Sequence, residues 1–314
     1  MRSVHDQNAR ALGRLTAIAV IVWLAYVGLL MLLRGGTITP ALLLVLGGLV
    51  AIAFLADRPV LREILPFPLI ALTWEAMRGL SNDLVSRVHA TDVVAVERSL
   101  FGPFSGGRTP TEALQAALHP PGTVTPLDSV MTAVYLGHFV APVVIGWLLW
   151  RRDHEVYYRY AMAMIILALA GYGTQLLFPV APPRLAAGFG ASVSVTDISA
   201  AVLDGFRLFP VAAWGYGNLS GNELAALPSL HAAFPLMGAF FLALVSRPAA
   251  WIALAWSALV WFSIVYLGQH FVVDALLGLV YVVVVCALIS HPVFDQVSGR
   301  LASLRLAVPT RPDQ

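Results

Sequence analysis

Long runs of apolar residues, separated by short polar connectors, dominate the chain. A run of about 20 apolar residues is long enough to cross a membrane as a helix. The pattern therefore predicts an all-α, polytopic membrane helix bundle of six to eight transmembrane spans. The second run is short and the third contains Glu75 and Arg78, so whether both of them span is left open. The eight candidate segments are residues 15–33, 40–56, 64–80, 127–150, 157–178, 228–246, 250–268 and 270–290.

Two long polar segments, residues 81–126 and 179–226, interrupt these runs. The periodicity predicts short amphipathic helices within them at 92–100, 110–118 and 196–203. Such helices can lie on the bilayer surface and gate lipid access, although a solvated linker fits the first segment equally well. The predicted division is an N-terminal membrane part with the first long segment (1–126), a core that holds the remaining apolar runs (127–291) and a cytoplasmic tail (292–314).

The composition narrows the class of protein. Hydrophobic residues make up 59% of the 314 residues and charged residues only 11%, with a mean hydropathy of +0.81. Soluble domains carry about 25% charged residues, so the composition indicates an integral membrane protein whose first partner is the bilayer. A net charge of +2 is too small to indicate nucleic-acid binding. The one cysteine, Cys286, excludes an intrachain disulfide.

The distribution of arginine predicts the orientation, because basic residues collect on the cytoplasmic side. With a cytoplasmic N-terminus, twelve of the nineteen arginines lie inside and seven outside, most of the latter in the two long segments. Both termini are then cytoplasmic, and the polar motifs at helix ends in the C-terminal half face the extracytoplasmic side.

Two histidines and one aspartate stand at these helix ends. His270 and Asp274 are four residues apart, so on a helix they share one face. An aspartate there can fix the tautomer of the imidazole and leave the other nitrogen free to attack. His231 follows Pro228 and Ser229, which look like a helix start suited to a phosphate. The combination points to phosphoryl transfer through a phosphohistidine, with a structural role for these residues as the alternative.

Three motifs carry a resemblance to a known family. They are Ala181-Pro-Pro-Arg184, Pro228-Ser-Leu-His231 and Gly268-Gln-His-Phe-Val-Val-Asp274 followed by Ala-Leu-Leu-Gly278. In this order, at membrane boundaries, they resemble the type 2 phosphatidic acid phosphatase superfamily, and within it the branch of inositol phosphorylceramide synthase and its bacterial relatives. The resemblance implies a helical enzyme, in a bacterial plasma membrane, with a histidine nucleophile and neither metal nor cofactor.

The resemblance also suggests a role for each residue. His270 attacks phosphorus, Asp274 orients it, and His231 is the general acid for the leaving oxygen and then the general base for the acceptor. Arg184, mounted rigidly after two prolines, clamps the phosphate together with Ser229. A snorkelling arginine at the membrane interface and a plain helix cap are the alternatives for these last two residues.

Two departures from the phosphatase pattern bear on the substrate. Leu177 stands where the family usually has a lysine, and Ile264 where it usually has an arginine. A site with fewer cations is better matched to a singly charged diester than to a doubly charged monoester. This favours a phosphotransferase, unless Arg78, Arg87 or Arg207 replaces the missing charge.

A second group of polar residues, namely Arg78, Asp128, Tyr135 and His138, could form a headgroup pocket, with an interhelical structural network as the alternative. The sequence shows no metal-ligand spacing, phosphate-cradling loop or nucleotide fingerprint.

Three functions remain open on sequence alone. The first is transfer of a phospho-headgroup, such as inositol phosphate, from a phospholipid donor to a lipid or alcohol acceptor. The second is hydrolysis of a lipid phosphate such as phosphatidic acid or a polyprenyl phosphate. The third is a non-catalytic scaffold or lipid transporter. The oligomeric state is not predictable from these features.

Overall fold

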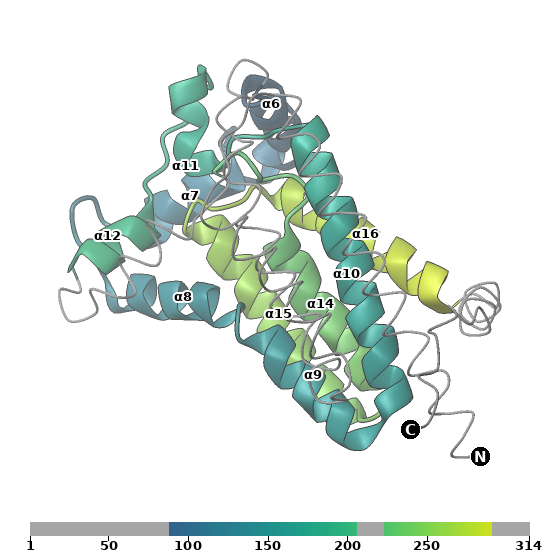
Figure 1. The fold of residues 1–314 in the computed structure, drawn as a ribbon. Helices are drawn as coiled ribbons and strands as arrows, with labels where there is room; N and C mark the ends of the chain where they lie inside the picture. The colour runs from purple at the N-terminus through teal and green to yellow at the C-terminus, as the bar shows by residue number, and fades with distance from the viewer. Residues whose placement is uncertain (1–87, 206–222, 291–314) are drawn as a thin grey trace, which may run out of the picture.

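The structure is a computed structural model that describes residues 88–205 and 223–290 (Figure 1). Regular secondary structure in these two ranges is helical, which confirms the all-α prediction for them. Two isolated β-bridges join His89 to Val180 and Val180 to Ala225. The helices are α6 (Thr91–Phe101), η2 (Gly102–Phe104), α7 (Pro110–Leu118), α8 (Pro126–Gly137), α9 (Ala141–Arg152), α10 (His154–Leu177), α11 (Pro183–Ala186), η3 (Ala187–Phe189), α12 (Ile198–Gly205), α14 (Leu230–Ala243), α15 (Arg247–Tyr266) and α16 (Val272–Ser290).

Three of these helices, α10, α15 and α16, are long and apolar enough to cross a membrane, which identifies the chain as an integral membrane protein. Helices α8 and α9 would make a fourth span if they act as one, although a bend of 49° separates them. Helix α14 is apolar but has only 14 residues. The predicted segments 15–33, 40–56 and 64–80 lie outside the described residues, so the total of six to eight spans stays a prediction.

The predicted short helices are present, and local sequence explains where they begin. Thr109 and Thr125 each accept a hydrogen bond from the backbone three residues later in a capping box, and a proline occupies the first turn of both helices. The helices predicted at 92–100, 110–118 and 196–203 correspond to α6, α7 and α12. Their placement on the bilayer surface stays a prediction, as do the domain boundaries, and the tail from residue 292 lies outside the described residues.

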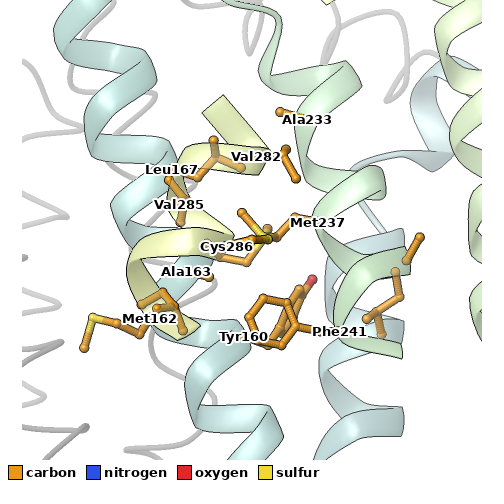
Figure 2. Close-up of a cluster of buried hydrophobic side chains, with 14 of the residues drawn as sticks. Tyr160, Met162, Ala163, Leu167, Ala233, Met237, Phe241, Val282, Val285 and Cys286 are labelled. Atoms are coloured by element: carbon orange, nitrogen blue, oxygen red, sulfur yellow. The ribbon is translucent and has the colours of Figure 1, made fainter. Parts of the chain in front are cut away.

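The apolar core lies where α10, α14 and α16 pack together, as Figure 2 shows. Tyr160 of α10 meets Phe241 of α14 edge to face, and Met237 lies against Cys286 of α16. A glycine allows one close approach here, because a Cβ at Gly171 would lie 2.6 Å from Leu230. This packing fixes the start of α14 against the other two helices.

The two long connecting segments are fastened to each other and to the bundle. Helices α6, α7 and α11 gather at the end of the bundle where α16 begins (Figure 1). Gln115 of α7 donates to the carbonyls of Thr196 and Tyr266 (both 2.9 Å) and accepts from the Thr196 amide (2.8 Å). One buried amide side chain therefore ties the first segment to the second segment and to the end of α15.

Candidate active site

Two histidines from different helices meet at the end of the bundle. His231 lies in the first turn of α14, two residues after the N-cap Ser229, and His270 lies in the turn between α15 and α16. Nδ1 of His231 and Nε2 of His270 are 2.8 Å apart, and both side chains are buried. The structure therefore brings together two residues that are 39 positions apart in sequence.

The turn that carries His270 is built from backbone hydrogen bonds. The amides of Gln269 and His270 donate to the Ile264 carbonyl (2.9 and 3.1 Å), which closes the end of α15. Gly268 has a φ of +79°, and a Cβ there would lie 2.8 Å from Val195. Only glycine fits both the backbone conformation and the space.

Asp274 contacts His270, although the two residues do not share a helix as predicted. Helix α16 begins at Val272, so His270 lies before it, because the turn ahead of α16 uses the His270 amide to close α15. Oδ2 of Asp274 is 3.4 Å from Nδ1 of His270 and accepts the Phe271 amide (2.8 Å). The predicted proximity of the two side chains is therefore present, with a different backbone around it.

The hydrogen bonds define the tautomers of the two rings. Nδ1 of His270 lies 2.9 Å from the Ala226 carbonyl, which can only accept, so Nδ1 carries the proton. In the neutral ring Nε2 then has a free lone pair, and Nδ1–H of His231 donates to it. This arrangement leaves Nε2 of His270 with a lone pair suited to nucleophilic attack and His231 as a hydrogen-bond donor beside it, and the catalytic roles of the two residues stay predictions.

Aromatic side chains from the break between α8 and α9 surround His231. The ring centroids of His138, Tyr135 and Phe139 lie 4.3, 5.3 and 6.1 Å from that of His231. His138 also donates from Nδ1 to the Tyr135 carbonyl. Two residues predicted for a headgroup pocket therefore lie beside the histidine pair, and their role there stays a prediction.

Arg184 is anchored to the same turn as His270. Its amide donates to the Gly268 carbonyl (3.1 Å), and its Nε donates to Oε1 of Gln269 (3.1 Å). Two carboxylates lie close to the guanidinium, with Asp197 at 3.6 Å and Glu223 at 3.9 Å. The guanidinium is therefore held by Gln269, the residue that precedes His270, and two carboxylates lie near it.

Ser229 forms the helix start that the sequence predicted. Its Oγ accepts the Ala232 amide (3.2 Å), and its own amide donates to the Asp274 carbonyl (3.0 Å). These bonds join the start of α14 directly to α16. Phosphate binding by Ser229 stays a prediction, because helix capping also accounts for its hydroxyl.

The other predicted residues are placed differently. Asp128 accepts from the Thr125 amide (2.6 Å), from Nδ1 of His119 (3.1 Å) and from the Tyr266 hydroxyl. These contacts make it a buried link between α8 and the end of α15, and its role toward a headgroup stays a prediction. Arg78 lies outside the described residues.

The two positions that depart from the phosphatase pattern differ in environment. Ile264 is fully buried in the apolar cluster between α8, α12 and α15, whereas Leu177 is 84% exposed at the end of α10. The Ile264 side chain therefore packs in the core, while the Leu177 side chain projects away from it.

One residue beside the site has no counterpart among the predictions. Glu97 of α6 is fully buried, and its two oxygens accept the amides of Val272 (2.9 Å) and Val273 (3.1 Å). Burial raises the pKa of Glu97 to about 7, the two amide donors oppose that rise, and the nearby Asp274 adds to it. The signal in the sequence was a carboxylate on the apolar face of α6, one turn after Val93.

Within residues 88–205 and 223–290, no three His, Cys, Asp or Glu side chains are grouped so that they could hold a metal ion. The groups that can do chemistry are a nucleophilic imidazole, a proton donor 2.8 Å away and an anchored guanidinium. Such a set can attack phosphorus, protonate the leaving oxygen and hold a phosphate.

Comparison with known proteins agrees with this chemistry. The chain is 26% identical over 264 residues to a protein from Bacteroides thetaiotaomicron named phosphoinositol dihydroceramide synthase, covering 80% of this chain and 83% of that protein. No solved structure matches the chain. The family model described as the PAP2 superfamily matches residues 111–288, more than half of the chain and including both histidines. The chain therefore belongs to the PAP2 superfamily, the type 2 phosphatidic acid phosphatase superfamily that its motifs indicated.

Proposed function

We propose that this protein is a membrane phosphotransferase that moves a phospho-headgroup from a phospholipid donor to a lipid or alcohol acceptor through a phosphohistidine. The observation that carries the proposal is the 2.8 Å contact between Nδ1 of His231 and Nε2 of His270, with Nδ1 of His270 committed to a carbonyl. The name of the Bacteroides relative suggests inositol phosphate as the headgroup and dihydroceramide as an acceptor.

In the first step the donor phosphate replaces the contact between the two rings. A separation of 2.8 Å leaves no room for a phosphorus atom, so substrate binding must move His231 and His270 apart. The lone pair on Nε2 of His270 forms a bond to phosphorus as the bond from phosphorus to the diacylglycerol oxygen breaks. His231, protonated on both nitrogens, gives its Nδ1 proton to that oxygen. Asp274 faces the positive charge that develops on the His270 ring.

The second step runs in the opposite sense. The acceptor hydroxyl transfers its proton to Nδ1 of His231 while its oxygen attacks phosphorus. The bond between phosphorus and Nε2 of His270 then breaks, which restores the neutral nucleophile. With water as the acceptor, the same sequence would be a hydrolysis, which releases the phospho-headgroup from a diester donor and inorganic phosphate from a monoester donor.

The charges around Arg184 support a diester as the donor. Asp197 and Glu223 offset the single positive charge of the guanidinium at 3.6 and 3.9 Å. In a partly buried site each additional uncompensated negative charge is costly. A phosphodiester brings one negative charge and a monoester brings up to two, so this arrangement favours the diester. Leu177 and Ile264 stand where the phosphatase pattern usually has cations, so these two positions contribute no positive charge.

The test uses purified protein in lipid nanodiscs, with phosphatidylinositol labelled in the inositol and with dihydroceramide. We expect the label to appear in a new lipid with little free inositol phosphate, and a phosphorylated His270 to be detectable by mass spectrometry. His270→Ala should abolish both signals, and His231→Ala should slow both steps. His154→Ala is the matched control, because His154 begins α10 at the far end of the bundle.

Rapid release of inorganic phosphate from phosphatidic acid, with no turnover of diesters, would replace the proposal by the phosphatase alternative. Asp197→Asn combined with Glu223→Gln should raise turnover of monoesters relative to diesters, because it removes the two negative charges beside Arg184. The proposed orientation, with cytoplasmic termini and an extracytoplasmic site in a bacterial plasma membrane, rests on the arginine distribution in the sequence.

A further inference from the structure

Helix α16 begins without a capping side chain of its own. The first amides of any helix lack partners within the helix, and Ser, Thr, Asp or Asn at the preceding position usually satisfies one of them. The residue before α16 is Phe271, which has no polar side-chain atom. Asp274 accepts the Phe271 amide and so provides only the backward half of a capping box. The forward half has to come from elsewhere.

Glu97 of α6 supplies that missing half from a position 175 residues away in sequence. Its Oε1 accepts the Val272 amide at 2.9 Å, and its Oε2 accepts the Val273 amide at 3.1 Å. The side chain is fully buried, so no water competes for these bonds. Both carboxylate oxygens are therefore used on two consecutive amides, which fixes the position and direction of the first turn of α16 relative to α6.

The apolar face of α6 packs against Phe271, the residue that lies between His270 and the capped amides of Val272 and Val273. Phe271 is fully buried in a cluster that includes Val93 and Val94 of α6. His270 precedes Phe271 directly, so α6 restrains the chain immediately after the nucleophile through a side chain and through two amides. The His270 backbone is restrained from the other side by its bond to the Ile264 carbonyl.

We propose that Glu97 is a positioning residue for the turn that carries His270 and for Asp274. Glu97 touches neither histidine in the contacts described above, and it acts through the backbone of Val272 and Val273. It lies outside residues 111–288, the part matched by the PAP2 family model, so the family match alone would not point to it. The inference rests on the proposed phosphohistidine mechanism for its link to catalysis.

Glu97→Gln is the main test, because it keeps the size of the side chain. Its amide oxygen can accept one of the two N–H groups, while its NH2 group faces the other as a second donor. We expect kcat to fall about tenfold to hundredfold, because small misplacements of a reacting group are costly, and KM for the lipid donor to change little. Glu97→Ala should lower kcat further. Asp92→Asn is the matched control, since Asp92 is an exposed carboxylate on the same helix.

A second measurement follows the cap itself, without using activity. Hydrogen exchange at the amides of Val272 and Val273 should accelerate in Glu97→Gln and stay unchanged in Asp92→Asn. All kcat values are normalised to the protein that elutes folded in size-exclusion chromatography, so a loss of folded protein is not counted as a loss of catalysis. The proposal is overturned if normalised kcat stays at the wild-type value in Glu97→Gln, whether or not exchange changes.

The kinetic comparison is made on the lipid phosphate ester that the wild type turns over fastest. It therefore keeps its meaning if the enzyme is a phosphatase rather than a transferase. Failure of the proposed function would appear as absence of phosphorylated His270 in the wild type, which is a separate readout.

Discussion

Gly278 sets the distance between α14, which carries His231, and α16, which carries Asp274. It lies in α16, one turn after Asp274, and faces the start of α14. A Cβ at this position would lie 2.6 Å from the Ser229 carbonyl oxygen, whereas ordinary contact begins at 3.4 Å. In Gly278→Ala the two helices must therefore separate locally by about 0.8 Å. The hydrogen bond from the Ser229 amide to the Asp274 carbonyl, now 3.0 Å, crosses the same contact.

Two consequences follow from this displacement. Overpacking of a buried contact costs about 1–3 kcal/mol of stability. The same shift would misplace His231 relative to His270 when a phosphate is bound between them, which should lower kcat by up to about a hundredfold. The assay is transfer of labelled inositol phosphate at saturating donor, together with the temperature of unfolding.

The matched control for this substitution is Gly173→Ala. A Cβ at Gly173, in α10, has no atom within 4 Å, so this variant should keep wild-type activity and stability. If Gly278→Ala were as active as Gly173→Ala, the contact between α14 and α16 would not set the geometry of the histidine pair, and the reasoning would be wrong.

Three further predictions concern the turn before α16, the buried carboxylate of Glu97 and the dependence of activity on metal ions. Gly268→Ala should lose most activity, because its Cβ would lie 2.8 Å from Val195, while Gly190→Ala, with a similar φ of +84° and open space, should lose little. The pKa of Glu97 is about 7 in the folded protein, against an ordinary value of 4.5 for an exposed glutamate. The folded state therefore binds the proton more tightly, and the free energy of unfolding should fall as pH rises from about 4.5 to about 7. Denaturant titrations should show a decline on the order of 3 kcal/mol in the wild type relative to Glu97→Gln, and equal pH profiles would contradict it. Activity should persist in EDTA, and loss that Mg²⁺ or Zn²⁺ restores would point to a metal-dependent mechanism.

Much of the fold follows from signals that act locally. Thr109 and Pro110 mark the start of α7, with Glu112 completing the capping box, and the structure begins the helix there. The order of the three motifs predicted that His231 and His270 belong to one site. These features depend on neighbours within a few residues or on a motif pattern, which is why the sequence was sufficient to predict them.

Other features depend on contacts that the sequence does not display. The segment predicted at 127–150 is broken between Gly137 and Ala141, and the apolar pattern is the same on both sides of that break. His270 lies outside α16 because its amide bonds to Ile264 and because Gly268 takes a positive φ, neither of which follows from residue spacing. The contact of Glu97 with α16 joins residues that are 175 positions apart.

The way residues 88–90 are bonded determines how short a working fragment can be. The His89 amide donates to the Pro179 carbonyl (2.9 Å), and the His89 carbonyl accepts from Ala181 (3.0 Å), close to the loop that leads to Arg184. The His89 ring also stacks on Phe178 at 3.7 Å. A fragment trimmed to the family match at residue 111 would remove this strand-like pairing and take their His89 partner from the Pro179 carbonyl and the Ala181 amide. A shortened protein meant to retain the histidine pair should therefore begin upstream of residue 88.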